Sequence, residues 1–344
     1  MSTNLQFLTH PWTIVRPPSD LTGGHWQVEI LNSAKTYKLH SAAIYPLQLA
    51  RTKKSIQELV QGIQSFVKVS DAVAQELVDK LISIGLLRAD PVKEAHPSLN
   101  LELWEKHSAL AAGEYHLGTF DLRFLDYTPG GSGWQKSRDR MENYSKASLD
   151  VDRHKNSYEY ESTIAVATPA ELKNQPTPVT FDEKIKALSS LAAMVTGTKP
   201  VPWTKVPLIR KTSPSGGSRH PIEVYVMLAN GEVYHCDAKE NRLGKIASVN
   251  PAEFVDSPML ENSAIFFLTC VFERNSFRYR EPRTFRSIHM DAGHIGGTLE
   301  ITAESLGLSV TDLNAVDETK FNTILNIDGY EEFLMAAVKV EEGV

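Results

Sequence analysis

A loop of small residues is the part of this sequence whose composition best suits chemistry. Pro214 is followed by Ser215, Gly216 and Gly217, and an alternating, β-branched run begins at Ile222. Glycine tolerates positive φ angles and lets another group approach the backbone closely. A rigid loop of this kind ahead of a strand suits a flat cofactor ring lying against main-chain N–H groups. The alternative interpretation is a tight turn before a strand, for which the same residue types are typical.

Further segments accompany this loop in a fixed order along the chain. The set is KTSPSGGSRHP (211–221), EVYHCD (232–237), RLGKI (242–246), FERNSFRYR (272–280), MDAGHIGGTL (290–299) and AESLGL (303–308). Together they resemble the SagB-type peptide dehydrogenases, a branch of the FMN-dependent nitroreductase superfamily that modifies ribosomally made peptides. In that family the segments correspond to the flavin loop, a strand hairpin, a segment with a Lys-Tyr catalytic pair, and the core dimerisation helix.

The resemblance implies a function, a cofactor and partners. It implies an FMN-dependent dehydrogenase that oxidises thiazoline or oxazoline rings to azoles and passes the electrons to oxygen. The implied partners are a precursor peptide with its leader and core, a second subunit in a homodimer or a heterodimer with a related dehydrogenase, and a cyclodehydratase complex. The alternative is a catalytically impaired subunit that binds peptide and scaffolds an active relative, because flavin sites in this superfamily lie at the dimer interface.

The expected catalytic residues are Arg278 and Tyr279, which align with the Lys-Tyr pair of the family. A buried lysine can lose its proton near pH 7 and act as a base, whereas arginine stays protonated. Arg278 is therefore expected to hold a substrate carbonyl or an oxyanion, and Tyr279 would have to take the proton. An ordinary ion pair of Arg278 with Glu273 or Glu281 is the competing interpretation.

The expected FMN-binding residues follow from the same resemblance. The ring should rest against Ser213–Gly217, namely Ser213, Pro214, Ser215, Gly216 and Gly217. The arginine motif that grips the phosphate in this superfamily is missing, because residues 165–174 contain no arginine. Charged partners for the phosphate must then come from elsewhere. The candidates for the phosphate are Arg210, Lys211 and Arg219, and Leu308 is a further expected cofactor-binding residue.

Composition limits the class of protein. The chain has 344 residues, 42% hydrophobic and 23% charged, with a net charge of −6, which describes a soluble globular protein and gives no reason to expect nucleic-acid binding. Two cysteines are too few for a disulfide framework. No signal peptide and no apolar run of ~18 residues is evident, so a cytoplasmic protein without membrane spans is expected. His289 and His294 lie five apart, which does not align two metal ligands, and no metal is expected.

Residues 1–92 read as a winged-helix-like module. Strands are expected near 25–31 and 36–40, followed by helices near 42–49, from Ser55 with a capping box to Glu58, and from Ser70 to Gly85. The module resembles the leader-peptide recognition element of peptide-modifying enzymes, in which a leader adds a strand to an exposed sheet edge. A small packing domain without a ligand is the alternative.

Residues 93–179 read as a connecting region, and residues 180–344 as an α+β nitroreductase-like domain with a mostly antiparallel sheet. The connecting region should hold a helix over 99–112 and exposed linkers over 158–161 and 169–178. In the domain we expect a helix from a capping box at Thr180, strands at 222–228, 231–236, 264–271 and 332–340, and a helix over 285–306. Glycines inside that helix lower its stability, which predicts close packing against a second subunit. They are Gly293, Gly296 and Gly297.

Overall fold

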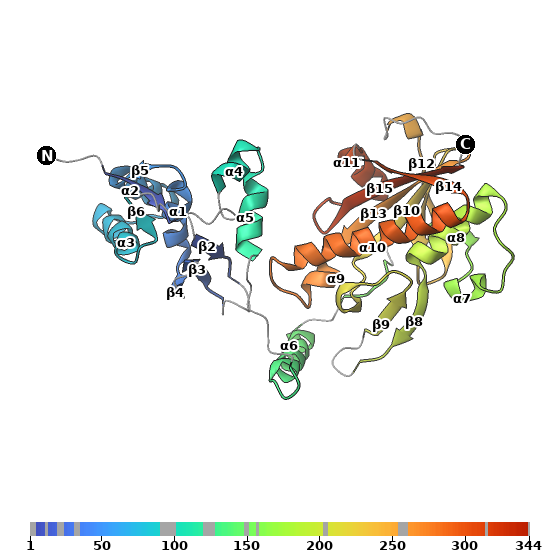
Figure 1. The fold of residues 1–344 in the computed structure, drawn as a ribbon, viewed down its shortest axis with the longest axis horizontal. Coiled ribbons are helices and arrows are strands. Elements are labelled where there is room, and N and C mark those ends of the chain that lie inside the picture. Colours follow the sequence, from blue (N-terminus) through green and yellow to red (C-terminus); the bar gives the residue numbers. More distant parts are fainter. Residues whose placement is uncertain are drawn as a thin grey trace. The chain divides into compact units, whose positions relative to one another are not determined.

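The structure, a computed structural model, shows two compact units (Figure 1). One unit comprises Met1–Phe124 with Arg280–Pro282, and the other Leu125–Tyr279 with Arg283–Val344. The residues that the structure describes are 5–10, 13–18, 24–30, 35–89, 101–119, 128–147, 151–155, 158–201, 206–253, 261–313 and 316–342. The module boundaries expected at residues 92 and 180 stay a prediction.

The first unit packs three helices and a small sheet around one apolar core. The helices are α1 (Ser41–Leu49), α2 (Ile56–Phe66) and α3 (Asp71–Ser83). The expected capping box starts α2, because Ser55 and Glu58 bond to each other's backbone N–H groups. The sheet has the order β5-β1-β6, formed by Lys54–Ser55, Gln6–Thr9 and Leu87–Arg88. Leu47, Leu59 and Val78 are among the buried residues of this core.

A second antiparallel sheet in this unit has the order β2-β3-β4, from Thr13–Arg16, Trp26–Ile30 and Lys35–Leu39. Two further helices follow, α4 (Leu101–Lys106) and α5 (Leu110–Thr119). The single helix expected over 99–112 is wrong, because Ser108 has a φ of 56° and interrupts it.

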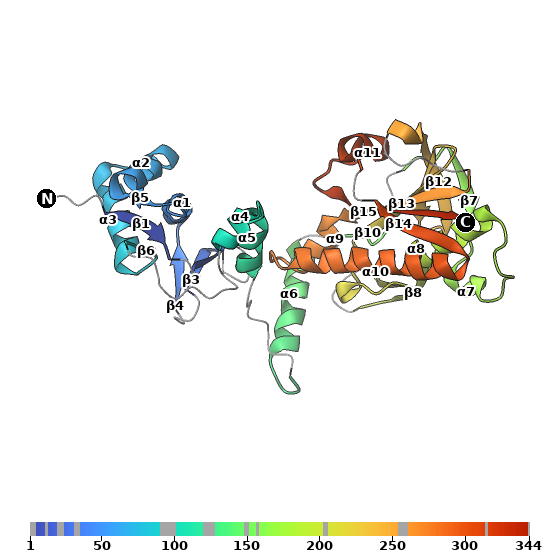
Figure 2. The same cartoon turned by 45° about the horizontal axis from the view of Figure 1, so that its top comes forward.

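The second unit is built on a seven-stranded sheet with the order β14-β15-β13-β10-β11-β12-β7, in which every neighbouring pair is antiparallel. This confirms the α+β class (Figure 2). The strands are β7 (Ser162–Ala165), β10 (Ile222–Leu228), β11 (Glu232–Asp237), β12 (Arg242–Ser248), β13 (Ser263–Val271), β14 (Leu308–Leu313) and β15 (Glu332–Glu342). A separate two-stranded sheet pairs β8 (Val195–Lys199) with β9 (Leu208–Lys211).

The expected linker at 158–161 is instead partly buried against the sheet, whereas most of 169–178 is exposed as expected. Residues Ser162–Ala165 pair with β12, and the Tyr158 hydroxyl lies 2.6 Å from the Leu325 carbonyl oxygen and 3.2 Å from the Tyr225 hydroxyl. A capping box at Thr168 opens the short helix α7 (Pro169–Leu172). The low apolar content of these residues led to the linker prediction, although their tyrosines hydrogen-bond to residues of the sheet and α11.

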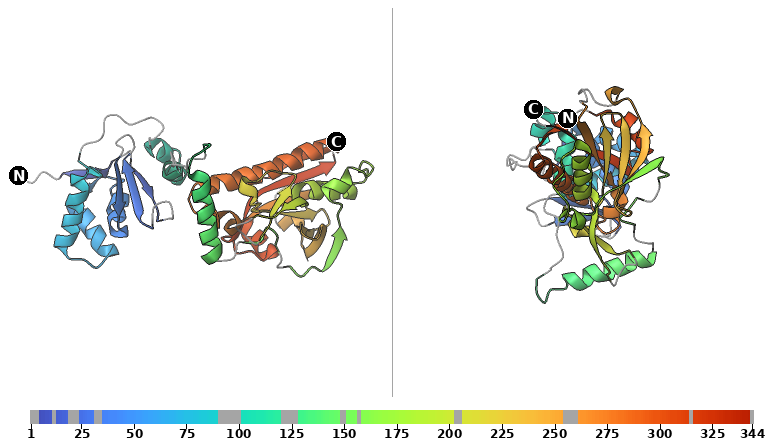
Figure 3. Two further views of the ribbon diagram at one scale, coloured as in Figure 1. Left: turned by 90° about the horizontal axis from the view of Figure 1, so that it is seen from below. Right: turned by 90° about the vertical axis from the view of Figure 1, so that its right-hand side faces the viewer.

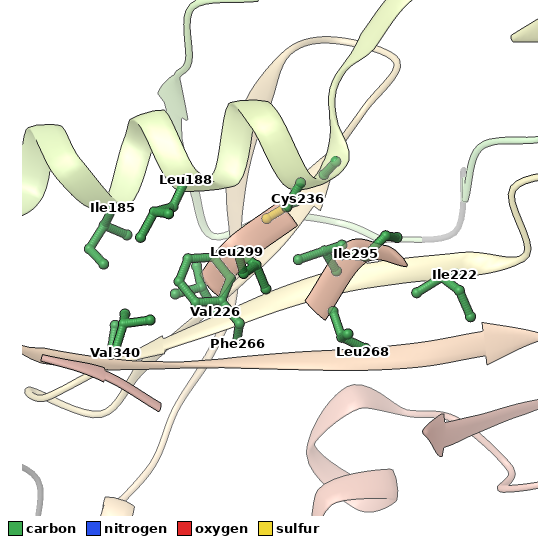
Figure 4. Close-up of a cluster of buried hydrophobic side chains, with 14 of the residues drawn as sticks. Ile185, Leu188, Ile222, Val226, Cys236, Phe266, Leu268, Ile295, Leu299 and Val340 are labelled. Atoms are coloured by element: carbon green, nitrogen blue, oxygen red, sulfur yellow. The ribbon is translucent and has the colours of Figure 1, made fainter. Parts of the chain in front are cut away.

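One face of the sheet is covered by α8 (Phe181–Ala193) and α10 (Thr284–Ser305), seen from further sides in Figure 3. The expected stripe on α10 is buried there: Ile288, Ala292, Ile295, Leu299 and Ala303. Figure 4 shows Ile295 and Leu299 beside Phe266 and Leu268 of β13, with Ile185 and Leu188 of α8 completing the same cluster. This packing explains why α10 is long and straight across the strands.

The opposite face carries a smaller core under α11 (Glu318–Leu325), where the tilted rings of Phe321 and Phe267 pack at 4.2 Å between their centroids. Two more helices belong to this unit, α6 (Gly133–Ala147) and α9 (Phe272–Ser276). Among the described residues, no helix has the length and apolar character needed to cross a membrane.

Candidate functional site

The candidate site is the loop that joins β9 to β10. After Lys211 the chain runs through Ser213–Ser215 into a short 3₁₀ turn over Gly216–Ser218. Gly217, Ser218 and His220 have φ angles of 65°, 52° and 45°. Residues other than glycine rarely adopt such angles, so Ser218 and His220 must be held by their surroundings. The loop is therefore a fixed structure and not a simple turn.

The surroundings that hold the loop belong to α10. Each of the four residues Ser213–Gly216 hydrogen-bonds a side chain of this helix. The contacts are Ser213 Oγ to Thr298 Oγ1 at 2.6 Å, Pro214 O to His294 Nδ1 at 3.2 Å, Ser215 Oγ to Asp291 Oδ2 at 2.6 Å, and Gly216 N to Asp291 Oδ1 at 3.1 Å. The sequence shows α10 as a helix but does not reveal these contacts, because about 75 to 85 residues separate the partners.

The structure brings Tyr279 to this loop, and Arg278 contacts the Tyr279 ring. A Cβ added at Gly217 would lie 2.2 Å from Tyr279 Oη, so only glycine leaves room for that hydroxyl. The Arg278 guanidinium carbon lies 5.3 Å from the centre of the Tyr279 ring, and its Nη2 is 3.5 Å from Ser137 Oγ. No ion pair of Arg278 with Glu273 or Glu281 occurs within the described residues. Tyr279 thus borders the loop, with Arg278 beside it.

The basic candidates differ in their availability. Arg219 is 2% exposed, its Nε donates to the Arg274 carbonyl oxygen, and its guanidinium lies 5.6 Å from the centre of the Phe277 ring. Arg210 is exposed and Lys211 partly buried, and neither side chain hydrogen-bonds or ion-pairs with a described residue. Burial lowers the pKa of Lys211 to about 8. Arg210 and Lys211 are therefore the cations that remain available near the loop.

Leu308 and His220 are both buried. Leu308, at the start of β14, is 3% exposed within the apolar core under α10. His220 is buried, with Nε2 3.1 Å from the Ile209 carbonyl oxygen, and burial together with Lys211 lowers its pKa to about 3. His220 is accordingly neutral at physiological pH and positions the end of the loop.

A buried charge network, which sequence reasoning missed, lies next to the loop. Glu223, the second residue of β10, ion-pairs with Arg274 at 2.5 Å and contacts His235 Nε2 at 2.9 Å. Although burial alone would raise the pKa of Glu223, Arg274 and His235 hold it well below its usual range. Arg274 also donates to the His220 carbonyl oxygen at 3.2 Å, which ties the network to the loop. The signal in the sequence was Glu223 itself, a charged residue within the apolar strand β10, which indicates a buried partner of opposite charge.

The other flank of α10 borders an open groove of about 660 Å³. Gly293, Gly296 and Gly297 line this groove, and a Cβ added at any of them would meet no atom within 4 Å. Strands β14 and β15 form its opposite wall, with Val310 and Met335 among the lining residues. The expected glycine surface is thus accessible along α10.

The loop fits a flavin ring. Gly216 is exposed, and a Cβ there would approach only Ser287 Cβ, at 3.8 Å, so a flat ring has open backbone to rest on. Of the phosphate candidates, Arg210 and Lys211 fit and the buried Arg219 does not. No cluster of His, Cys, Asp and Glu side chains that could hold a metal ion occurs in the described part of the chain.

Comparison with known proteins gives consistent matches. The Nitroreductase family profile matches residues 175–340. The trifolitoxin-processing protein TfxB of Rhizobium leguminosarum bv. trifolii is 26% identical over 348 residues, covering 92% of this chain and 89% of that protein.

Two solved structures are also similar to this chain. A protein of Anabaena variabilis, described as a nitroreductase, is 22% identical with a TM-score of 0.44, and the alignment covers 60% of this chain but only 45% of that one. The E. coli microcin synthetase McbBCD complex with truncated pro-MccB17 contains a chain 16% identical, with a TM-score of 0.39, covering 74% of this chain and 100% of that one. The profile match, together with the antiparallel sheet and the helix α10 across it, shows that residues 175–340 form a domain of the nitroreductase family.

Proposed function

We propose that this protein is an FMN-dependent dehydrogenase that oxidises azoline rings of a ribosomally made peptide to azoles. The observation that carries the proposal is the fixed loop Ser213–Gly217 with the Tyr279 hydroxyl against Gly217, inside a nitroreductase-family domain. The peptide substrate is supported by the similarity to a trifolitoxin-processing protein along nearly the whole chain. When bound, FMN supplies a two-electron acceptor for the hydride.

The residues of this chain account for the remaining parts of the reaction. Ser213–Gly217 would support the flavin ring, and Arg210 and Lys211 would bind its phosphate. Tyr279 would take the proton from the carbon next to the ring nitrogen, because Arg278 cannot accept one. Tyr279 must be a phenolate to accept this proton, and the nearby guanidinium would interact favourably with that negative oxygen. Loss of one proton and one hydride converts the azoline to the aromatic azole.

The N-terminal unit is proposed to hold the leader peptide. Its sheet β2-β3-β4 has β2 and β4 as edge strands, and a leader peptide would add a strand beside one of them. Leader binding would raise the local concentration of the core peptide at the loop. Hydrogen exchange of the full chain with a leader peptide should slow at Lys35–Leu39 or Thr13–Arg16, whereas a scrambled peptide should leave both strands unchanged.

A second candidate function is favoured by two observations. Arg219 is buried, and arginine replaces the usual lysine at position 278. A chain with these features would scaffold a related dehydrogenase through the α10 groove and contribute its loop to a shared site. The partner would be a homologous subunit, and a cyclodehydratase could join the same complex.

The test is the flavin content and activity of the purified chain. If the dehydrogenase proposal holds, the protein takes up FMN and is yellow, Tyr279→Phe loses activity, and Arg278→Lys gains activity because lysine can release a proton. A chain that stays colourless alone, but restores activity to a homologous subunit, would instead support the scaffold function. If the dehydrogenase proposal holds, Gly216→Val should abolish flavin binding.

A further inference from the structure

One side of α10 holds the loop through hydrogen bonds, and each of these bonds has a defined donor and acceptor. Asp291, His294 and Thr298 are spaced three and four residues apart, so they lie on the same side of the helix. This side is distinct from the stripe that packs into the core and from the glycine flank that borders the groove. The loop Ser213–Gly216 lies along it, one loop residue after another.

Asp291 accepts hydrogen bonds at both of its oxygens. The Ser215 hydroxyl has one proton and already accepts the His220 N–H at 2.8 Å, so its proton must point at Asp291 Oδ2, 2.6 Å away. The other oxygen, Oδ1, accepts the Gly216 N–H at 3.1 Å. An ionised carboxylate can accept at both positions without donating a proton. Asp291 is 4% exposed, and burial raises its pKa, a shift that these two hydrogen bonds offset in part.

The other two contacts have defined directions as well. Thr298 donates its hydroxyl proton to the His294 carbonyl oxygen at 2.9 Å and therefore accepts from Ser213 Oγ at 2.6 Å. The Pro214 carbonyl oxygen can only accept, so His294 Nδ1 carries a proton and donates to it at 3.2 Å. Every donor in this set thus meets an acceptor, which restricts the loop to one arrangement.

We propose that Asp291 is a positioning residue that holds Ser215 and Gly216 in the conformation that binds a flat ligand. Asp291 acts through these two residues and does not touch the ligand itself. The residues with positive φ angles, Gly217, Ser218 and His220, come shortly after Gly216 in the chain. The hydrogen bond from His220 N–H to Ser215 Oγ connects them to the Asp291 carboxylate. The identity of that ligand as FMN rests on the proposed function, whereas the holding of the loop does not.

The first test uses hydrogen exchange of the full chain without any ligand. Asp291→Asn keeps the side-chain shape, but its amide N–H₂ must face either the Ser215 proton or the Gly216 N–H. We expect the amides of Gly216 and His220 to exchange about ten- to a hundredfold faster, as for loss of a hydrogen bond to a charged group. Amides of β13 should be unchanged, which separates loop release from loss of the fold. Glu304→Gln, at an exposed position of the same helix, is the matched control.

The second test measures FMN affinity by fluorescence for the same variants. Asp291→Asn should weaken binding by about tenfold, and adding Ser215→Ala should weaken it little further, because both changes break one chain of hydrogen bonds. Ser215→Ala alone serves as the milder variant if Asp291→Asn fails to fold. Unchanged exchange at Gly216 and His220 in both single variants would overturn the inference.

The remaining outcomes distinguish this inference from the proposed function. Faster exchange with unchanged FMN affinity would overturn the positioning role of Asp291, because the loop would then move without consequence for the ligand. Faster exchange in a chain whose unmodified form binds no FMN would support the holding of the loop and contradict the dehydrogenase proposal.

Discussion

The two flanks of α10 are built in opposite ways. On the loop flank, the side chains of Asp291, His294 and Thr298 form hydrogen bonds with the loop Ser213–Gly216 of the same chain. On the groove flank, Gly293 and Gly296 offer bare backbone, with nothing within 4 Å of an added Cβ. One flank of α10 is therefore covered by the chain's own loop, whereas the other flank is open.

This difference indicates what each flank requires. A set of directional hydrogen bonds fixes one conformation and suits a site that must bind a ligand in one orientation. A glycine surface in a helix costs stability unless another surface packs closely against it. Met290 and Ile301, which are 62% and 72% exposed on the same helix, add apolar area that one chain does not cover. We therefore expect a second subunit on the groove flank.

The largest effect on the free energy of unfolding is expected in the buried charge network next to the loop. Glu223→Gln removes the charge that pairs with the buried Arg274 and should lower the free energy of unfolding by about 3–5 kcal/mol. The folded-state pKa of Glu223 lies below its unfolded value, so its contribution is present above that unfolded value and is lost as pH falls. Urea unfolding at pH 7 and below pH ~4 should show the gap between variant and unmodified protein closing.

The control for Glu223 is Glu240→Gln, an exposed carboxylate in the turn between β11 and β12. It should change the free energy of unfolding by less than about 0.5 kcal/mol. Equal effects of the two substitutions would contradict the role assigned to the buried network, and with it the view that the loop flank depends on buried charges.

Gly296→Leu tests the groove flank. The side chain finds free space in one subunit and improves helix propensity by about 0.8 kcal/mol, so the isolated subunit should not lose stability. Association should weaken by at least about a hundredfold, because the bulk separates the two surfaces. Sedimentation velocity provides the measurement, and Glu304→Leu on the same helix provides the control. A monomer in the unmodified protein, with its natural partners present, would end this expectation.

Gly217→Ala compares strain with contact on the loop flank. Alanine at a φ of 65° costs about 1 kcal/mol, and its Cβ would also displace the Tyr279 hydroxyl. The total loss in unfolding free energy should be about 2–3 kcal/mol. Gly307→Ala, at a φ of 71° with open space around it, should cost only the first part. Identical losses in the two variants would show that Tyr279 does not lie against the loop.

The smallest effect concerns Lys211. Its pKa is lowered to about 8, so the side chain is charged below that pH and loses its charge above it. FMN affinity should therefore fall by about tenfold between pH 7 and pH 9 if Lys211 binds the phosphate. Lys211→Arg should give a flat profile over this range, because arginine stays charged. A flat profile in the unmodified protein would leave Arg210 as the phosphate ligand.

Local signals in the sequence were sufficient for most of the fold. The capping boxes at Ser55 and Thr180 mark helix starts that the structure confirms, and the apolar stripe from Ile288 to Ala303 predicted the buried face of α10. These features depend on residues a few positions apart. The strand β7 was missed because its apolar content is low and its pairing with β12 joins residues about 80 apart.

The candidate site was predictable only in part. The small-residue loop and Tyr279 stand out by residue type, and the structure brings them together. The burial of Arg219 was not visible, because its partners are a carbonyl oxygen and an aromatic ring far along the chain. Asp291 resembles an ordinary surface acid of a helix until the loop is placed against it. Long-range polar contacts of this kind have no sequence period.

The most direct test of the proposed activity is mass spectrometry of an azoline-containing precursor peptide incubated with the purified protein, FMN and oxygen. We predict a mass decrease equal to two hydrogen atoms for each oxidised ring, which requires Tyr279 and is lost when Gly216 is replaced by Val. An unchanged peptide mass with FMN bound and a homologous partner subunit present would contradict the assignment of this chain as an azoline dehydrogenase.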